Sequence, residues 1–506
     1  MSNNGHITTW RSISRKRRHT NAHRGECFAL VGVLKTCAKL KDIHKGIKLH
    51  DDIRNRELLH KSSLYLSNTL IDMYVKCGMP SKAQQVHEEL RVRNIVTWNV
   101  LITGYAQQSQ GREALTCFER MQSEGLLPDV VTFTCILNAC GTTLAIGKGK
   151  QLHNEIVCAG LLDKDIVLGN ALLDMYVKCK DLSKATQVLH ELPVRNVVSW
   201  NSLLTGYVQQ GQGHKALDWF ERMRGEGFSP DGVTFICILK ACSCTYDISK
   251  GKEIHNWIIV SGWLEKDIMV GNCLVDMYVK CGVLPDAQQV LEELPRRNEV
   301  SWSTLIAGYI KQAQCNEALN CFEKMRGEGL SPDAVTFTHA LTACGNTGSI
   351  DKGREIHEEI VNKGLLKGNC VLGSALVNMY AKCGILVKAQ QVLEELPARN
   401  EVSWSTLIVG YGEQGRGHEA LTCFDRMLSE GLTPDAVSFL CLLNACGNSG
   451  LLDEAQSYFT NMSKKYGIVP SLDHHTCMVM VLGRAGHFDK AMSVIKTMPC
   501  SDHPPV

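Results

Sequence analysis

The sequence contains no charge-free run of about eighteen apolar residues, which excludes an ordinary transmembrane helix. Only 13 of its 506 residues are Pro, and hydrophobic side chains make up 44% of the chain, so a proline-rich disordered protein is also excluded. A secretory signal is missing as well. The 23 cysteines therefore do not indicate the disulfide scaffold of a small secreted protein. We expect a soluble chain with a substantial core.

No C-x-x-C spacing occurs anywhere, so the commonest zinc-binding pattern is absent and no metal or other cofactor is expected. Many cysteines instead recur at a fixed interval of 102 residues. Small buried thiols at helix-packing positions explain this recurrence better than bridges do. The two recurring sets are Cys77, Cys179, Cys281 and Cys383, and Cys140, Cys242, Cys344 and Cys446.

Acidic residues are missing from the first 24 positions, which carry six Lys and Arg together with several Ser and Thr. This composition resembles an organellar transit peptide over residues 1–25. A nuclear localisation patch or a basic RNA-binding arm is the alternative. Beyond this segment, 48 basic residues face 52 acidic ones, so any nucleic-acid binding must depend on local contacts rather than on bulk charge.

An internal repeat of 102 residues dominates the rest of the chain, and each such block divides into three related units. It is seen in Trp98, Trp200, Trp302 and Trp404, and equally in Asn94, Asn196, Asn298 and Asn400. Within one block the units span 197–231, 232–267 and 268–298.

Each unit has the pattern of two short helices. In 197–231, apolar residues follow the i, i+3, i+4 spacing twice, as in Leu203, Leu204 and Tyr207. Gly227 is placed for a left-handed helix end, and Ser199 is placed to cap the first helix. Helices of about twelve residues are marginal alone, so stability must come from stacking between neighbours.

The sequence thus predicts an all-α fold: a right-handed superhelical solenoid of about fourteen helix-turn-helix repeats, with first helices lining its concave face. The array is expected over 27–503, followed by a short tail at 504–506. Its predicted units are 27–63, 64–94, 95–129, 130–165, 166–196, 197–231, 232–267, 268–298, 299–333, 334–369, 370–400, 401–435, 436–471 and 472–503.

The units resemble the pentatricopeptide repeats of plant organellar RNA-binding proteins, in the subclass that alternates long and short repeats. The motifs that carry the resemblance are VVSWNSLLTGYVQQGQGHKALDWFERMRGEGFSPD, then GVTFICILKAC with ISKGKEIHNWII, then NCLVDMYVKCG with AQQVLEELPRRN. The resemblance extends from about Cys27 to the C-terminus. The tetratricopeptide family, a protein-binding scaffold, has a uniform period and a W-x-x-L-G-x-x-Y pattern that is absent here.

In the family that the chain resembles, the fifth and last side chains of a repeat select one base of single-stranded RNA. By this resemblance, the pairs that favour U are Asn99 with Asp129 and Asn201 with Asp231. The pairs that favour C are Asn68 with Asn94, Asn170 with Asn196 and Asn272 with Asn298. The pairs that favour G are Ser303 with Asp333 and Ser405 with Asp435, and the pair that favours A is Ser374 with Asn400. Thr134 with Asp165 and Thr338 with Asn369 are compatible with purines, whereas Ile236 and Leu440 cannot hydrogen-bond a base. The implied RNA is C-U-n-C-U-n-C-G-n-A-G, 5′ to 3′.

Two further sets of residues have competing interpretations. The second residue of nearly every unit is apolar, which fits either contact with base faces or packing between repeats; examples are Val96, Val198, Met269, Val300, Val371 and Val402. The thirteenth residues of the short units either follow RNA phosphates or are solvated helix ends; they are Lys76, Lys178, Lys280 and Lys382. The terminal Asp and Asn residues are equally suited to capping the next helix.

Members of the subclass often continue into a zinc cytidine-deaminase-like domain, whereas this chain ends shortly after CMVMVLGRAGHFDKAMSVIKTMP. We therefore expect no catalytic centre. The resemblance implies a monomeric specificity factor for C-to-U editing of mitochondrial RNA, or alternatively of chloroplast RNA, with a deaminase supplied in trans and no membrane contact. Factors for RNA stabilisation, splicing or processing, and a protein-interaction scaffold, are the other two classes.

Overall fold

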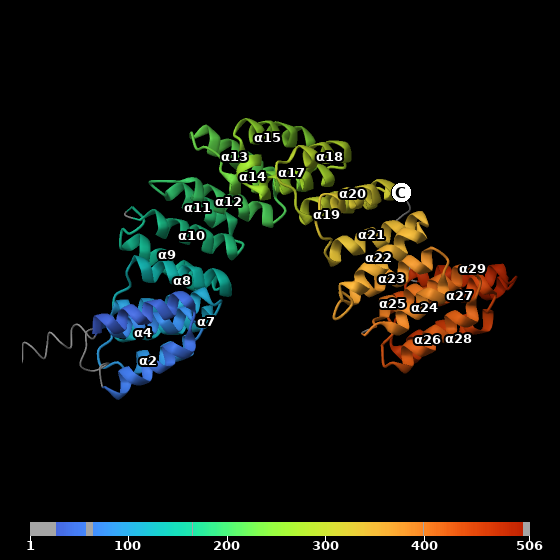
Figure 1. Ribbon diagram of the computed structural model, residues 1–506, viewed down its shortest axis with the longest axis horizontal. Helices are drawn as coiled ribbons and strands as arrows, with labels where there is room; N and C mark the ends of the chain where they lie inside the picture. Colours follow the sequence, from blue (N-terminus) through green and yellow to red (C-terminus); the bar gives the residue numbers. More distant parts are fainter. Residues whose placement is uncertain (1–26, 57–63, 164, 398, 499–506) are drawn as a thin grey trace, which may run out of the picture. The chain divides into compact units, whose positions relative to one another are not determined.

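The computed structural model describes residues 27–56, 64–163, 165–397 and 399–498, and over these ranges every regular element is a helix (Figure 1). The proposed transit peptide and the tail at 504–506 lie outside the described residues. The helices fall into two compact units, which meet in the sequence between Thr245 and Tyr246 and are described separately.

The first unit is a succession of helical hairpins (Figure 1). It begins with a helix over 27–40. The helices that follow are α2 (Ile43–Asn55), α4 (Leu64–Lys76), α5 (Pro80–Glu89), α6 (Ile95–Gln107), α7 (Gly111–Ser123), α8 (Val130–Thr143), α9 (Ile146–Cys158), α10 (Ile166–Lys178), α11 (Leu182–Glu191), α12 (Val197–Gln209), α13 (Gly213–Gly225) and α14 (Gly232–Thr245).

The second unit repeats the same arrangement. Its helices are α15 (Ile248–Val260), α16 (Trp263–Lys266), α17 (Ile268–Lys280), α18 (Leu284–Glu293), α19 (Glu299–Lys311), α20 (Cys315–Gly327), α21 (Ala334–Thr347), α22 (Ile350–Asn362), α23 (Cys370–Lys382), α24 (Leu386–Glu395), α25 (Glu401–Glu413), α26 (Gly417–Ser429), α27 (Ala436–Ser449), α28 (Leu452–Tyr466), α29 (Leu472–Arg484) and α30 (Phe488–Lys496).

Stacking between neighbouring hairpins builds both units. Helices α4, α6, α8, α10, α12 and α14 each pack on the next in that order, and so do α17, α19, α21, α23, α25, α27 and α29. Each of these first helices also packs on the second helix of its own hairpin where that helix belongs to the same unit. The predicted all-α solenoid of helix-turn-helix repeats is therefore confirmed as the fold class.

A tryptophan from each 102-residue block anchors the core. Trp98, Trp200, Trp302 and Trp404 are all buried. The indole Nε1 of Trp98, Trp302 and Trp404 donates to Glu124, Glu328 and Glu430 at 2.9–3.1 Å. Trp200 is buried as well, but its Nε1 has no hydrogen-bond partner among the described residues. Burial of these large rings contributes strongly to the packing of the core.

The two recurring sets of cysteines differ in burial. Cys140, Cys242, Cys344 and Cys446 are fully buried, as predicted, and burial raises the pKa of the Cys140 thiol to about 12. Cys77, Cys179, Cys281 and Cys383 are only partly buried, so the prediction of core thiols is wrong for them. They directly follow the last residue of their helices.

Candidate nucleic-acid interface

The last residue of most repeats caps the first helix of the next repeat. Asn94, Asn196, Asn298 and Asn400 each accept from the backbone N–H three residues later, at 2.9–3.0 Å. Asp129, Asp231, Asp333 and Asp435 do the same at 2.8–2.9 Å. Asp165 and Asn369 also cap their helices. Short side chains with an oxygen are favoured at this position because they satisfy a backbone N–H that has no partner within the helix.

The cap of α12 is therefore Asn196, and the expectation that Ser199 caps this helix is wrong. Ser199 is the third helical residue, and its hydroxyl accepts from the backbone N–H of Asn196 at 3.3 Å. Both residue types cap helices well, and the helix begins one turn earlier than the serine suggests.

The fifth residue of a repeat reaches this capping residue in five of the ten predicted pairs. Asn99 Nδ2 donates to Asp129 Oδ1 at 3.0 Å, and Asn201 Nδ2 donates to Asp231 Oδ1 at 2.9 Å. The corresponding distances are 3.4 Å from Asn170 to Asn196, 3.3 Å from Asn272 to Asn298 and 3.2 Å from Ser374 to Asn400.

Five predicted pairs have no direct bond among the described residues. Ser405 contacts Asp435 through Ser438, with 3.1 Å between the two hydroxyls. Ser303 Oγ lies 3.5 Å from His339 Nδ1. The hydroxyls of Thr134 and Thr338 donate to carbonyls of their own helices, and Asn68 Oδ1 is buried without a partner. The direct bond is thus missing in repeats of all three lengths, including both 36-residue repeats with a predicted pair.

A buried hydroxyl beside the pair was missed in the sequence. Thr132 Oγ1 lies 2.6 Å from Asn99 Oδ1 and 2.8 Å from Asp129 Oδ1, and Thr234 makes the equivalent contacts with Asn201 and Asp231. The other residues at this position are Thr97, Ser199, Ser301, Thr336, Ser403 and Ser438. These hydroxyl residues can be recognised in the sequence as a Ser or Thr that lies three residues after an Asn or Asp.

These contacts favour the charged form of the acidic member. Burial alone would raise the pKa of Asp129, but hydrogen bonds from Thr132 and Asn99 outweigh it and hold this pKa below its usual value. The pair therefore presents a carboxylate at neutral pH, with one oxygen engaged by the protein.

A row of exposed apolar side chains runs beside the pairs. The second residue of each unit from Val96 to Val437 is between 47% and 66% exposed, so packing between repeats does not account for it. The row consists of Val96, Val131, Val167, Val198, Val233, Met269, Val300, Val335, Val371, Val402 and Val437. Each of the two units thus has exposed apolar side chains at one recurring position of its repeats.

The lysines at the thirteenth position of the short units are not equivalent. Lys76, Lys178 and Lys280 form ion pairs of 2.7–2.8 Å with an aspartate one turn earlier. In α23 that aspartate is replaced by Asn378, and Lys382 Nζ donates to Asn346 Oδ1 at 2.7 Å instead.

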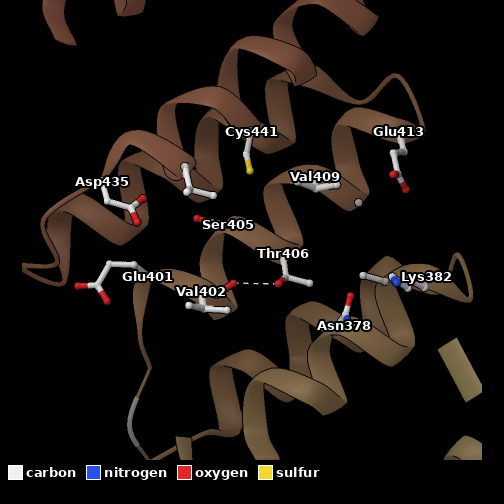
Figure 2. A pocket seen from close by; sticks show the side chains of 13 residues that line it. Asn378, Lys382, Glu401, Val402, Ser405, Thr406, Val409, Glu413, Asp435 and Cys441 are labelled. Carbon is white, nitrogen blue, oxygen red and sulfur yellow. Dashed lines mark hydrogen bonds between the residues drawn. The ribbon is translucent and has the colours of Figure 1, made fainter. Parts of the chain in front are cut away.

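Lys382 borders a hollow of about 350 Å³ between α23, α25 and α27. Figure 2 shows Val402, Ser405 and Cys441 around this hollow, with Asp435 toward one end and Lys382 toward the other. The hollow thus combines a predicted pair, two members of the apolar row and a cation. Its volume is within the usual range for small-ligand sites.

The described ranges hold no group of three or more His, Cys, Asp or Glu side chains that could bind a metal ion. None of the helices described is both long and apolar enough to span a bilayer.

Family models match much of the chain. The "PPR repeat family" model matches residues 93–142, 195–244, 297–346 and 399–448. The "PPR repeat" model matches 65–95, 170–197, 272–299, 335–365, 437–466 and 474–503.

Curated relatives agree with the models. A pentatricopeptide repeat-containing protein of Arabidopsis thaliana is 36% identical over 86% of this chain and 62% of its own length. A mitochondrial one from the same plant is 34% identical over 92% of this chain and 67% of its own length. A third is 34% identical over 94% of this chain and 84% of its own length. The chain thus spans about two thirds of the first two relatives.

Solved structures share the fold. The crystal structure of the pentatricopeptide repeat protein PPR10 from maize has a TM-score of 0.64 at 22% identity and covers 96% of this chain and 76% of its own. PPR10 in complex with an 18-nt psaJ RNA element gives a TM-score of 0.70 at 20% identity over 92% and 73%. With matching repeat models, similar relatives and a shared fold, the chain belongs to the pentatricopeptide repeat family.

Proposed function

We propose that the surface formed by the fifth and last side chains and the apolar row binds single-stranded RNA, one base per repeat and with sequence preference. The observation that carries this proposal is the hydrogen-bonded pair, as in Asn201 and Asp231, next to exposed Val198 and Val233. The RNA element bound by PPR10, which has the same fold, supports it.

Capping determines which side-chain atom of the last residue remains available to hydrogen-bond a base. The backbone N–H engages Oδ1 of the cap, which leaves Oδ2 of an aspartate or Nδ2 of an asparagine for the ligand. A carboxylate oxygen accepts the ring N3–H of uracil, whereas an amide N–H donates to the bare N3 of cytosine. This difference accounts for the expected U at Asp129 and Asp231 and the expected C at Asn94, Asn196 and Asn298.

The apolar row supplies contact with base faces. A base beside Asn201 would lie between the second residues of two successive repeats, Val198 and Val233, which are 55% and 52% exposed. Stacking on protein side chains is tolerant of sequence, so the row contributes affinity while the polar pairs contribute preference.

We further propose that the RNA is organellar and that the chain directs C-to-U editing, with the deaminase supplied by another protein. The alternation of 31-, 35- and 36-residue units supports this subclass. Relatives named mitochondrial or chloroplastic support an organelle, with the mitochondrion as our first choice. Organellar transcript sequencing after gene disruption tests it: lost editing sites would agree, whereas changed transcript ends or retained introns would indicate RNA processing instead.

RNA binding itself is tested by changing one pair. The fifth nucleotide of C-U-n-C-U-n-C-G-n-A-G faces repeat 197–231, where we expect wild-type protein to favour U over C about tenfold, equivalent to about 1.4 kcal/mol. Asp231→Asn keeps the cap but exchanges acceptor for donor, so it should reverse the preference. Fluorescence anisotropy with four RNAs differing at this nucleotide measures it.

The matched control is Asn196→Asp, which should change the preference at the fourth nucleotide only, from C to U. Equal affinity of wild-type protein for this RNA and its scrambled version would contradict sequence-specific binding. Failure to bind any RNA would favour the protein-interaction scaffold.

A further inference from the structure

One position next to the pairs differs among the four 102-residue blocks. Three blocks carry a cysteine as the sixth residue of the 36-residue unit, namely Cys135, Cys237 and Cys441, and the third block carries His339. The blocks are otherwise closely similar around this position. His339 is therefore the exception at a recurring cysteine position.

His339 makes a contact that its counterparts do not make. It lies in α21 with Nδ1 3.5 Å from Ser303 Oγ, the fifth residue of repeat 299–333. Cys135 and Cys237 instead contact Thr103 and Thr205 at 3.1 and 3.2 Å. In the third block this threonine is replaced by the smaller Ala307, so the larger imidazole and the smaller neighbour change together.

The fourth block shows what lies at the equivalent place. Cys441 lines the hollow of about 350 Å³ together with Ser405 and Asp435, which correspond to Ser303 and Asp333 (Figure 2). The two repeats carry the same serine–aspartate pair, yet one has an imidazole where the other has a thiol. This side chain, together with Ala307 in place of Val409, thus distinguishes two sites that would otherwise select the same base.

We propose that His339 is a third base-selecting side chain of repeat 299–333, which donates a hydrogen bond from Nε2 to an acceptor atom of guanine. The inference rests on the proposed RNA binding. When Ser303 donates to Nδ1, the proton of the neutral ring is on Nε2, and guanine offers the acceptors O6 and N7. Within the described parts of the chain the ring has a hydrogen bond at Nδ1 only, and the residue is partly buried, so Nε2 is left for a ligand.

The surroundings keep the ring neutral. Burial lowers the pKa of His339, and Asp333, the nearby charged group, opposes this only in part. A neutral imidazole provides one directional donor, whereas the thiol of Cys441 is a weak donor. The third block should therefore discriminate for guanine more strongly than the fourth.

Reciprocal variants of the full chain test the inference. The probes are synthetic C-U-n-C-U-n-C-G-n-A-G RNAs with each of the four bases at the eighth nucleotide, which faces repeat 299–333, or at the eleventh, which faces 401–435. His339→Cys should weaken binding of guanine at the eighth nucleotide about fivefold, the loss expected for one hydrogen bond, with no change at the eleventh. Cys441→His combined with Val409→Ala, which copies the third block, should strengthen guanine binding at the eleventh nucleotide only.

Controls separate the possible failures. Exposed His418→Cys should alter neither nucleotide, and thermal melting of each variant checks that the array stays folded. An unchanged four-base profile at the eighth nucleotide in folded His339→Cys would overturn the role of His339 even where wild-type protein binds its RNA. No binding by wild-type protein would instead overturn the proposed function.

Discussion

His87 sets the first 102-residue block apart from the other three. His87 in α5 is fully buried, both of its ring nitrogens are without a hydrogen-bond partner among the described residues, and its ring centre lies 4.2 Å from that of Trp98. Burial lowers its pKa to about 4. The other three blocks carry Leu189, Leu291 and Leu393 at this position, where no polar group needs a partner.

We expect His87→Leu to stabilise the first unit by about 1–3 kcal/mol at pH 7, because it removes polar atoms buried without partners. It should also remove a pH dependence. The unfolded chain binds a proton near pH 6.5 but the folded chain only near pH 4, so wild-type stability falls as pH decreases through this window. Urea unfolding at pH 7 and pH 5 measures both effects.

The reverse substitution, Leu189→His, is the matched control and should introduce the same acid sensitivity one block later. A His87→Leu protein that unfolds at lower urea than wild type at pH 7 would show that the histidine has a stabilising role.

The polar pairs were found in the sequence, but their supporting residues were not. The fifth and last positions were predicted from the resemblance to the repeat family, and variation of the fifth side chain among Asn, Ser and Thr within a fixed repeat agrees with it. The hydroxyl of Thr132 and the imidazole of His339 become significant only when neighbouring helices bring them to Asn99 and Ser303. Such contacts depend on side-chain direction between repeats, which a periodic pattern does not specify.

At the scale of elements, one pair of helices packs more closely than its counterparts. Gly412 in α25 faces Ala445 in α27, and a Cβ atom on Gly412 would come within 2.7 Å of the Ala445 Cα. The other blocks carry Ala106, Val208 and Ile310 at this position, against equivalent alanines. The closer approach brings together the two helices that line the hollow beside Ser405.

We expect Gly412→Ala to destabilise the second unit by about 1–3 kcal/mol, because the clash involves backbone that cannot move without separating the two helices. Chemical unfolding gives the size of the effect. Gly327→Ala in α20 is the control: nothing lies within 4 Å of its added Cβ atom, so this change should be neutral or stabilising by up to about 1 kcal/mol. Equal effects of the two substitutions would contradict the close approach.

The helical hairpins were predictable from local signals. Gly227 has a φ of +85°, as expected for a left-handed helix end, and the apolar spacing located the stacked faces. The spacing did not locate the first residue of each helix, because Asn196 and Ser199 are both good caps and only backbone geometry decides between them. Nor did it separate Cys77 from Cys140, since periodicity gives recurrence but not depth.

At the scale of the whole molecule, positive charge on the proposed RNA surface is unevenly distributed. The lysines of the first three short units are each compensated by an aspartate of the same helix, whereas Lys382 is paired with the neutral Asn346. Acidic residues outnumber basic ones beyond the N-terminal segment, and Glu401 and Glu413 line the same hollow as Lys382. A lysine without an ion pair to its own helix therefore has a large share in attracting phosphates.

We expect Asn378→Asp, which copies the other short units, to neutralise Lys382 and weaken RNA binding about threefold or more at low salt. If Lys382 contacts one phosphate, the slope of log affinity against log salt should decrease in magnitude by about 0.7. Titrations between about 50 and 200 mM salt measure it. Asp72→Asn should have the opposite effect by releasing Lys76, and unchanged slopes in both variants would exclude phosphate contacts at these lysines.

The terminal Asn and Asp residues both cap a helix and, in the proposed function, contact a base. These two roles limit which substitutions such a protein can accept at these positions. A gene that acquires a new RNA target must change these positions, yet each replacement must still hold the start of a helix. Only a few short oxygen-bearing residues meet both demands. Single substitutions can therefore direct the protein to only a narrow range of new RNA sequences. A designed change of target is safest when it exchanges Asn for Asp and keeps the neighbouring hydroxyl.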